Sequence, residues 1–416
     1  MKYNERFADR ILSGRLQNSS AILIEGTRGC GKTETARQQA ASVVRFDADR
    51  EVRIKMEVDP KSVLEGAPPL LLDEWQEYPE IWNYVRRAID ERKRKGRFIL
   101  TGSAVPDDRV KRHSGAGRFS TIKMRPMSLA EKGWSSGEVS LDALMRGAPP
   151  SSETVPFCLK TLAERLTLGG WPGLLGANAH DGLQFVRDYM HFIAEVDLSK
   201  VSSKRRDPQK VRRLLQSLAR NISTEASITT LAKDAGGSDR GLDGEAVAEY
   251  LFALERLMVV ENLPAWSTHI RSSETLRKAP KRHFADPSLA IGVLGISVPK
   301  LTADLHSLGL LFESLAIRDM RIYAEVHGGR VFHYRDSRGL EIDAIIEYPD
   351  GTWGAFEIKL GIGAADEAAN TLQKFAAKID TSKTQAPSAL TVITGNGFAH
   401  RRPDGVNVVP LSALSV

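Results

Sequence analysis

The sequence predicts an α/β protein that begins with a parallel-sheet domain. Short apolar runs alternate with helical patterns through residues 1–130, one of these runs leads into a glycine-rich segment, and another ends in two acidic residues. Strands that alternate with helices favour a parallel sheet covered by helices on both faces. We expect strands at 21–25, 43–47, 70–73, 98–101 and 121–124.

Composition excludes several classes of protein. Of the 416 residues, 42% are hydrophobic and 26% are charged, which excludes a disordered or collagen-like chain. No apolar run is long enough to span a bilayer and no secretory signal is recognisable, so we expect no membrane association. The two cysteines, Cys30 and Cys158, cannot form a disulfide framework, and we therefore expect a cytoplasmic protein.

A phosphate-binding loop is the most specific motif in the chain. Residues 26–33 match the pattern G-x-x-x-x-G-K-[ST] between an apolar strand and a helical run, which is the context this motif needs. Backbone N–H groups of such a loop wrap phosphates, and the start of the helix adds its dipole. Lys32 is expected to reach the β- and γ-phosphates of ATP, and the Thr33 hydroxyl to bind Mg²⁺. The expected nucleotide contacts are Gly26, Thr27, Arg28, Gly29, Cys30, Gly31, Lys32, Thr33 and Glu34.

Two further strand ends complete the expected ATP site. One apolar run delivers Asp73 to the Mg²⁺ ion and Glu74 to the attacking water, where it acts as the catalytic base. Another apolar run ends in hydroxyl groups, so we expect Thr101 or Ser103 beside the γ-phosphate. A strand-capping turn is the alternative explanation for these two residues.

These motifs resemble those of the AAA-type ATPases of bacteria and archaea that carry an uncharacterised C-terminal domain. The resemblance rests on the segments G-T-R-G-C-G-K-T, L-L-L-D-E-W-Q and F-I-L-T-G-S-A, and it extends to 114–119, 170–172 and 284–287. It implies a five-stranded core of the additional-strand type that binds and hydrolyses ATP. In related ATPases an arginine from a neighbouring subunit completes the site, which implies a homo-oligomer. Arg118 and Arg112 lie where such an arginine can sit, and a surface arginine is the alternative for each.

The middle of the chain is basic and has the element order of a winged helix. Between residues 200 and 285 there are 16 Lys and Arg against 10 Asp and Glu. Cations on a wing bind DNA phosphates, whereas solvated charges on a protein-binding surface explain the same composition. Three helical patterns and two extended segments lie at 212–220, 228–233, 245–257, 258–263 and 281–284. The expected DNA contacts are Arg271, Lys278, Lys281 and Arg282.

The last part of the chain contains a hairpin that carries two acids and a lysine. If Asp350 is the centre of its turn, Asp343 lies opposite Glu357, and Lys359 shares their face. The alternative is a two-residue turn at Asp350 and Gly351, which sets Asp343 opposite Ile358 and puts Glu357 on the other face. Like charges so close repel each other, and a bound divalent cation reverses that penalty. We therefore expect a second Mg²⁺ or Mn²⁺ site at this hairpin, with Glu313 from the preceding helix as a third acid.

This arrangement resembles the restriction-endonuclease-like nuclease core, whose signature is an Asp followed by Glu-x-Lys. The signature residues here are Asp343, Glu357 and Lys359, and Gln373 can assist them. The resemblance implies metal-dependent cleavage of DNA. The alternative is a retained fold that cuts nothing and uses these charges as a salt-bridge cluster.

We expect four parts in the chain: a P-loop ATPase core in 1–130, a helical lid or connector in 131–205, a winged-helix-like domain in 206–299 and a restriction-endonuclease-like α/β domain in 300–416. One hypothesis is that ATP turnover drives or regulates a nuclease that acts on DNA. The other hypothesis is a nucleotide-switched scaffold whose inactive nuclease-like domain binds a protein partner. Metal-dependent DNA cleavage by the protein distinguishes the two.

Overall fold

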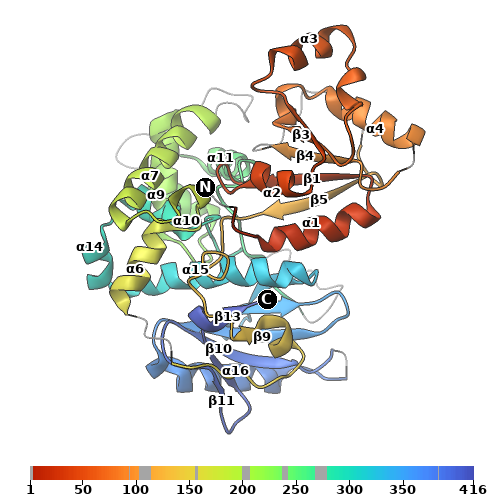
Figure 1. Ribbon diagram of the computed structural model, residues 1–416. Helices are drawn as coiled ribbons and strands as arrows, with labels where there is room; N and C mark the ends of the chain where they lie inside the picture. The colour runs from red at the N-terminus through yellow and green to blue at the C-terminus, as the bar shows by residue number, and fades with distance from the viewer. Residues whose placement is uncertain are drawn as a thin grey trace.

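The computed structural model describes residues 3–92, 94–102, 114–154, 158–198, 207–236, 242–267, 279–382 and 384–416. These residues form a parallel sheet near the N-terminus, a group of helices in the middle of the chain and a mixed sheet near the C-terminus (Figure 1). The long helix α15 (Leu305–Val326) lies across the molecule above the mixed sheet (Figure 1). None of the described helices combines the length and the apolar surface that crossing a bilayer requires.

The N-terminal sheet has five parallel strands in the order β2-β3-β4-β1-β5. Each of the five expected strands is present, so the predicted parallel-sheet core is confirmed. β4 lies between β1 and β3, and this is the additional strand that the resemblance implies. The strands are β1 (Ala21–Gly26), β2 (Ser42–Arg45), β3 (Leu70–Asp73), β4 (Phe98–Gly102) and β5 (Phe119–Met124).

The side chains of β1 alternate between two hydrophobic cores, one on each face of the sheet. Ile22 and Ile24 face a core that includes residues of α1 and α2, whereas Ala21 and Leu23 face a core that includes residues of α3 and α4. A continuous apolar run is therefore needed here, because both faces of the strand are buried. The four helices are α1 (Phe7–Asn18), α2 (Lys32–Gln39), α3 (Arg50–Val58) and α4 (Ile81–Arg92).

The described middle of the chain is mostly helical. Its basic part contains three helices, α9, α10 and α11, and antiparallel bridges then join Val260 to Phe284 and Leu263 to Lys281. Arg271 and Lys278, two of the expected DNA contacts, lie outside the described residues. The helices are α5 (Leu141–Met145), α6 (Leu159–Leu168), α7 (Ala179–Phe192), the π-helical turn η4 (Ile193–Asp197), α9 (Pro208–Arg220), α10 (Ile228–Gly236), α11 (Gly244–Arg256), α13 (Pro287–Leu294) and α14 (Val298–Ala303).

The C-terminal sheet is mixed, with six strands in the order β11-β12-β10-β9-β8-β7. The sequence predicts a helix, two strands, a helix and a strand here. The structure adds β7, which pairs with β8, and the last strands. The elements are β7 (Arg330–Arg335), β8 (Glu341–Glu347), β9 (Trp353–Lys359), α16 (Ala365–Lys378), β10 (Ala389–Thr394), β11 (His400–Arg401) and β12 (Asn407–Pro410).

A separate short pairing joins β13 (Leu414–Ser415) to β6 (Val139–Ser140). Short 3₁₀ turns lie at Ser62–Leu64, Trp75–Glu77, Pro172–Leu174, Ile362–Ala364 and Leu411–Ala413.

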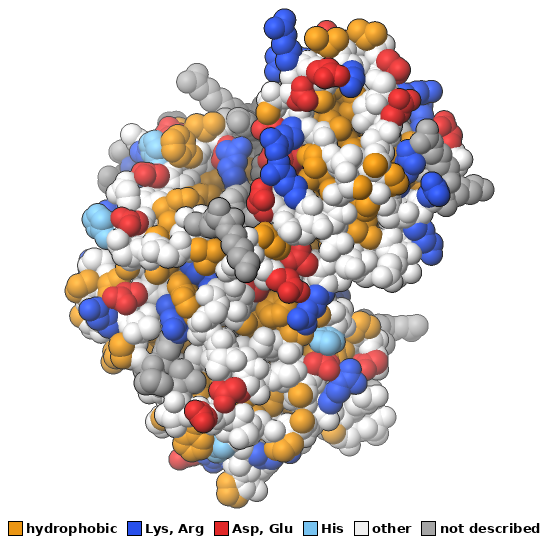
Figure 2. Space-filling view, viewed as in Figure 1, with side chains coloured by type: hydrophobic (Ala, Val, Ile, Leu, Met, Phe, Trp, Pro, Cys, Tyr) orange, Lys and Arg blue, Asp and Glu red, His pale blue; other side chains and the backbone are white. Residues whose placement is uncertain are grey.

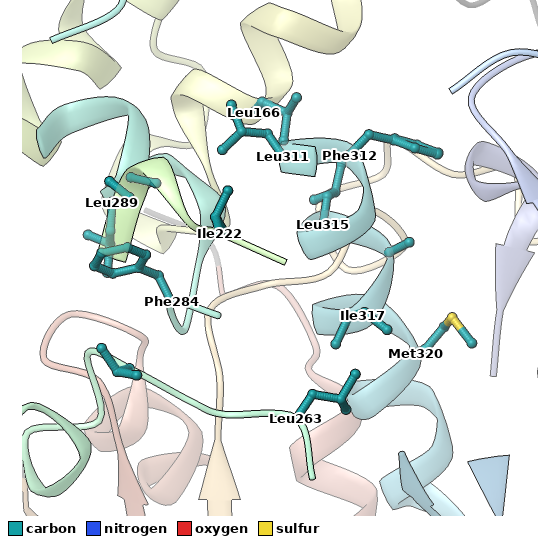
Figure 3. Packing of buried hydrophobic residues seen from close by; sticks show 14 of the residues in the cluster. Leu166, Ile222, Leu263, Phe284, Leu289, Leu311, Phe312, Leu315, Ile317 and Met320 are labelled. Carbon is teal, nitrogen blue, oxygen red and sulfur yellow. The ribbon is translucent and has the colours of Figure 1, made fainter. Parts of the chain in front are cut away.

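Helix α15 belongs to a hydrophobic cluster that runs from Leu129 to Leu414. Of its 22 residues 14 are buried, and a helix buried around most of its surface is a core element. Figure 3 shows Leu311 of α15 beside Leu166 of α6, with Phe284 and Leu289 across the same region. The three parts expected after residue 130 therefore share one core.

Buried charges fix α15 against its neighbours. The Arg318 guanidinium donates to Asp286 Oδ2 at 2.6 Å and to Asp319 Oδ1 at 2.7 Å. Asp286 is 0% exposed and also accepts from the N–H of Gly170 at 2.9 Å, while Asp319 accepts from the N–H of Leu129 at 2.9 Å. Buried charges are tolerated only when they are paired and hydrogen-bonded. This set therefore specifies where the chain segments around residues 129, 170 and 286 meet α15.

Removing the Asp286 carboxylate is expected to destabilise the protein. Asp286→Ala takes one carboxylate from the buried Arg318 and the acceptor from the Gly170 N–H, so the free energy of unfolding should fall by about 3–5 kcal/mol. The control Asp304→Ala removes only the exposed cap of α15 and should cost about 1 kcal/mol. Urea unfolding followed by circular dichroism compares the two variants, and equal losses would contradict the role given to Asp286.

Candidate nucleotide-binding site and C-terminal carboxylate cluster

The loop between β1 and α2 passes close to β5 and then turns into a helix. A Cβ atom at Gly26 would lie 2.2 Å from the carbonyl oxygen of Met124, which is too close for any side chain. Gly31 precedes α2 with a φ of 101°, in the left-handed region that favours glycine. The first N–H groups of α2 have no partner within the helix, so the end of this loop is a natural anion site.

Lys32 lies inside the loop. Its ammonium donates to the carbonyl oxygens of Gly26 and Thr27, at 2.8 and 3.0 Å, and the residue is buried. Charged phosphate oxygens are stronger acceptors for an ammonium group than these neutral carbonyls. The ammonium is therefore held at the loop by bonds that a phosphate can replace.

One carboxylate oxygen joins three elements of the N-terminal sheet. The Thr33 hydroxyl donates to Asp73 Oδ1 at 2.8 Å, and the Thr101 hydroxyl donates to the same oxygen at 2.5 Å. Thr33 and Asp73 thus lie together, as the motif requires, and their oxygens are of the kind that Mg²⁺ prefers. The Thr101 hydroxyl is buried and is held by Asp73 at the end of β4, so its contact with the γ-phosphate stays a prediction. Ser103 lies outside the described residues.

Glu74 follows Asp73 in an unusual backbone conformation. Its φ of 53° is in the left-handed region, which few residues other than glycine adopt. Its carboxylate accepts a hydrogen bond from the side-chain amide of Gln76. Such strain often persists at functional sites because surrounding contacts hold it. Gln76 was not identified from the sequence, where its place two residues after Glu74 is the only signal.

The segment 170–172 covers the loop. Pro172 lies 3.4 Å from where a Cβ atom at Gly31 would be, and the Trp171 ring lies 4.0 Å from the same position at Gly29. The Trp171 indole donates to the Ser288 hydroxyl at 2.9 Å. Two short segments quoted for the family resemblance, 170–172 and 284–287, thus meet beside the loop although they are distant in sequence.

A cavity of about 290 Å³ opens beside the start of α2. Its lining includes Tyr3, Arg6, Glu34, Met127 and Pro172. Arg6 donates to the carbonyl oxygen of Cys30 at 2.8 Å, so the chain before α1 supports the loop directly. Burial raises the pKa of the Tyr3 hydroxyl, which therefore stays protonated. No sequence motif marks Tyr3 or Arg6, so neither residue was predicted.

The arginines considered for contact with a neighbouring subunit have different outcomes. Arg118 donates to Asp90 Oδ1 at 2.6 Å and is held against α4 of its own chain. This contact favours the alternative interpretation, in which Arg118 is a surface arginine. The ion pair with Asp90 raises the pKa of Arg118. Arg112 lies outside the described residues.

The hairpin of β8 and β9 has the expected register. Ala344 pairs with Phe356 and Glu347 with Trp353, and continuing this register by one residue sets Asp343 opposite Glu357. Lys359 lies with both acids, at 2.7 Å from Glu357 Oε2 and 3.3 Å from Asp343 Oδ2. The three signature residues therefore share one face. Gln373 instead donates to the backbone carbonyl of Asp404.

Lys281 enters the same cluster from the middle of the chain. Its ammonium lies 2.9 Å from Glu313 Oε1, 2.8 Å from Glu341 Oε1 and 3.2 Å from Asp343 Oδ1, and the residue is 2% exposed. The expectation that Lys281 contacts DNA is therefore wrong. Arg282 is 7% exposed and donates to the carbonyl oxygen of Ala226, so it is not a surface contact either. Lys281 is covered where it contacts Glu313 of α15, and Arg282 is covered where it contacts Ala226, between α9 and α10.

The surface also lacks a single basic face in the view of Figure 2. Lys and Arg side chains on this side of the molecule are interspersed with Asp and Glu among the described residues. Arg271 and Lys278 lie outside the described residues.

The cluster balances its charges without a metal ion. Burial raises the pKa of Glu313 and of Glu357 to about 8, and the charge of Asp343 adds to both shifts. Burial also raises the pKa of Asp343, but the ammonium groups of Lys281 and Lys359 outweigh it and hold the pKa below its usual value. Among the described residues, no group of three or more His, Cys, Asp or Glu side chains is arranged to hold a metal ion. With protons on Glu313 and Glu357, the two ammonium groups face the two remaining acids, Glu341 and Asp343.

The free energy of unfolding is expected to fall as the pH rises from about 5 to about 8. In the folded protein Glu313 and Glu357 keep a proton up to a pKa of about 8, whereas their ordinary value is 4.5. The folded state therefore binds more protons in this window, and each group lowers stability by at most about 1.4 kcal/mol per pH unit. Glu313→Gln should flatten the decline measured by urea unfolding, while Glu367→Gln on the exposed face of α16 should leave it parallel to wild type. Glu357 still titrates in Glu313→Gln, so part of the decline should remain, and a decline as steep as that of wild type would contradict the assignment.

Three family models match separate parts of the chain. An AAA domain matches residues 18–132, a domain of unknown function (DUF8612) matches 159–300, and a second domain of unknown function (DUF4143) matches 308–414. The AAA match contains the loop, Asp73 and Glu74.

The chain is also similar to two mycobacterial proteins. An uncharacterised protein of Mycobacterium bovis and one of Mycobacterium tuberculosis are each 26% identical to it over 367 residues, which are 86% of this chain and 74% of the relative.

Two solved structures show a weak similarity to the chain. The Walker-type ATPase of Pyrococcus abyssi matches with a TM-score of 0.44 and 15% identity, over 71% of this chain and 96% of that one. AMPPCP-bound DnaA from Aquifex aeolicus matches with a TM-score of 0.21 and 14% identity, over 61% of this chain and 89% of that one. Both TM-scores are low, so the interpretation of the N-terminal part of the chain depends on the matched AAA domain and on the geometry of the loop. Residues 18–132 of this chain match an AAA domain, and they contain the loop motif and the acidic end of β3.

Proposed function

We propose that this protein binds ATP at the loop after β1 and hydrolyses it with Mg²⁺. The observation that carries the proposal is the 2.8 Å hydrogen bond from the Thr33 hydroxyl to Asp73. It joins the end of the phosphate-binding loop to the acidic end of β3, which are the two halves of an ATPase site. A solvent-facing acidic strand end would not be held to the loop in this way.

Each residue of the site has a role that follows from its position. The backbone of the loop and Lys32 bind the phosphates, and Thr33 with Asp73 holds Mg²⁺, which neutralises phosphate charge when it is bound. Glu74 accepts the proton of the attacking water, and Gln76 positions its carboxylate.

The cavity beside α2 suits the adenosine part of ATP. Its volume of about 290 Å³ is close to the lower end of ligand pockets, about 300 Å³. The loop residue Gly31 borders it, so a nucleotide whose phosphates lie on the loop can extend directly into it. Tyr3, Met127 and Pro172 supply the flat and apolar surface that a base needs.

For the C-terminal sheet, the charge balance supports a scaffold more than a nuclease. Convergence of Asp343, Glu357 and Lys359 supports the nuclease hypothesis. Against it, Lys281 already binds Asp343, Glu313 and Glu341. We infer that this protein is a nucleotide-dependent scaffold in which these charges stabilise the junction between the helices and the mixed sheet.

Two substitutions test the ATPase. Lys32→Ala should abolish turnover and most ATP affinity, because the phosphates lose their cation. Glu74→Gln should keep ATP affinity but stop hydrolysis, because the carboxylate is needed only when water attacks. The controls Lys95→Ala and Glu77→Gln change exposed residues and should behave as wild type. Phosphate release and nucleotide binding measure both, and full turnover in Lys32→Ala and Glu74→Gln would end the assignment.

A metal titration separates the scaffold from the nuclease. Without nucleotide, the C-terminal cluster should show no saturable Mn²⁺ binding at pH 7, and single- or double-stranded DNA should stay intact, because Lys281 and Lys359 neutralise the acids. Comparison with Asp343→Asn isolates this cluster from the phosphate-binding loop. Mn²⁺ binding and DNA cleavage that are both lost in Asp343→Asn would establish the nuclease instead.

A further inference from the structure

An ion pair connects the phosphate-binding loop to the helical part of the chain. The Arg28 guanidinium lies 3.1 and 3.2 Å from the two carboxylate oxygens of Asp197. The Asp197 side chain is 9% exposed, whereas the Arg28 side chain is 57% exposed. Arg28 belongs to the variable part of the loop motif, so the motif itself does not require an arginine there.

Asp197 is the last residue of η4, a π-helical turn that follows α7. Such turns are rare and are frequent at functional sites. In a regular helix each residue turns the next side chain by about 100°, so the wider turn changes the direction of every side chain that follows it. The π turn therefore determines that Asp197, and not a neighbouring side chain, meets the loop.

A buried carboxylate beside a phosphate-binding loop is unfavourable for ATP binding. The loop and the start of α2 attract anions, and a triphosphate brings several negative charges to them. Like charges repel more strongly where water is excluded. Arg28 offsets the charge of Asp197 at the point where the helical part of the chain reaches the loop.

We propose that Arg28 acts as a positioning residue that neutralises Asp197, so that α7 and η4 can lie on the loop without repelling ATP. This inference rests on the proposed ATP binding and adds a determinant of affinity outside the loop motif. In it, Arg28 acts through Asp197 and makes no direct bond to the phosphates. The Arg28 cation acts on the charged phosphates, so its loss should lower the affinity for ATP and leave the affinity for adenosine unchanged.

The contact between α7 and the loop does not depend on this ion pair alone. Tyr189 of α7 lies against Trp171, with ring centroids 5.0 Å apart, and Trp171 itself lies over Gly29 of the loop. These apolar contacts stay in place when Arg28 or Asp197 loses its charge. Substitution of either residue is therefore expected to leave the fold intact.

A double-mutant cycle tests the proposal with a non-hydrolysable ATP analogue, Mg²⁺ and isothermal titration calorimetry. Arg28→Ala should weaken affinity about ten-fold, which is about 1.4 kcal/mol, because the Asp197 charge is exposed to the phosphates. Arg28→Lys should stay within about two-fold of wild type, because a lysine cation still neutralises Asp197. Asp197→Asn should bind no more weakly than wild type. The double variant Arg28→Ala with Asp197→Asn should return to within about two-fold of wild type, because neither charge is left.

Other results of the same measurements would contradict the proposal. If the double variant binds as weakly as Arg28→Ala, Arg28 contacts the phosphates itself and the proposal is wrong. The proposal is also wrong if Arg28→Ala binds as wild type, or if its adenosine affinity falls as much as its affinity for the ATP analogue. If wild-type protein does not bind the analogue, the proposed function fails, whereas the inference alone fails when wild type binds but the cycle is additive. Thermal unfolding without nucleotide identifies a variant that has merely lost its fold.

Discussion

The buried pairing of Asp286 with Arg318 holds together segments of the chain that are far apart in sequence. Asp286 also accepts from the backbone of Gly170, a residue 116 positions earlier, and so places the segment 170–172 over the phosphate-binding loop. Buried charges demand good geometry from their partners, because an unpaired one is strongly destabilising. The surroundings of the loop therefore depend on a carboxylate in the middle of the chain and an arginine on α15. The loop motif supplies the phosphate site, but this pairing determines what covers it.

The parts of the structure that could be predicted from the sequence are those that depend on local patterns. The five strands of the first sheet are short apolar runs with both faces buried, and the loop motif fits between one of them and its helix. The register of the hairpin agrees with the first of the two turns considered, in which a turn centred on Asp350 leaves Asp343 opposite Glu357. In each case the interacting residues are close in sequence, so the pattern contains the answer.

The residues that could not be predicted have partners elsewhere in the chain. Lys281 is basic, lies in a basic region and was assigned to the surface, yet its partners Glu313 and Asp343 are 32 and 62 residues away. Composition indicates that such a lysine is exposed, because Lys is seldom buried unless paired, and the pairing is visible only in the fold. Asp197 was missed for the same reason, because its partner Arg28 is 169 residues away. The local charge pattern therefore led to the wrong prediction that Lys281 is exposed. The apolar patterns, in contrast, correctly predicted the buried strands of the N-terminal sheet.

The ATP site and the C-terminal cluster share one structural element. Lys281 binds Glu313 and Asp286 binds Arg318, and both pairs have a sequence separation of 32 residues, so the segment 281–286 follows α15 in the same direction. One end of this segment meets the cover of the phosphate-binding loop, and the other end neutralises the cluster at the mixed sheet. A displacement of the cover that carries Asp286 with it must either break the pair with Arg318 or move the segment that contains Lys281. If Lys281 leaves, Glu341 and Asp343 lose its ammonium and only Lys359 remains in the cluster to balance the acids. The segment 281–286 thus links the cover of the phosphate-binding loop to the charged cluster at the C-terminal sheet.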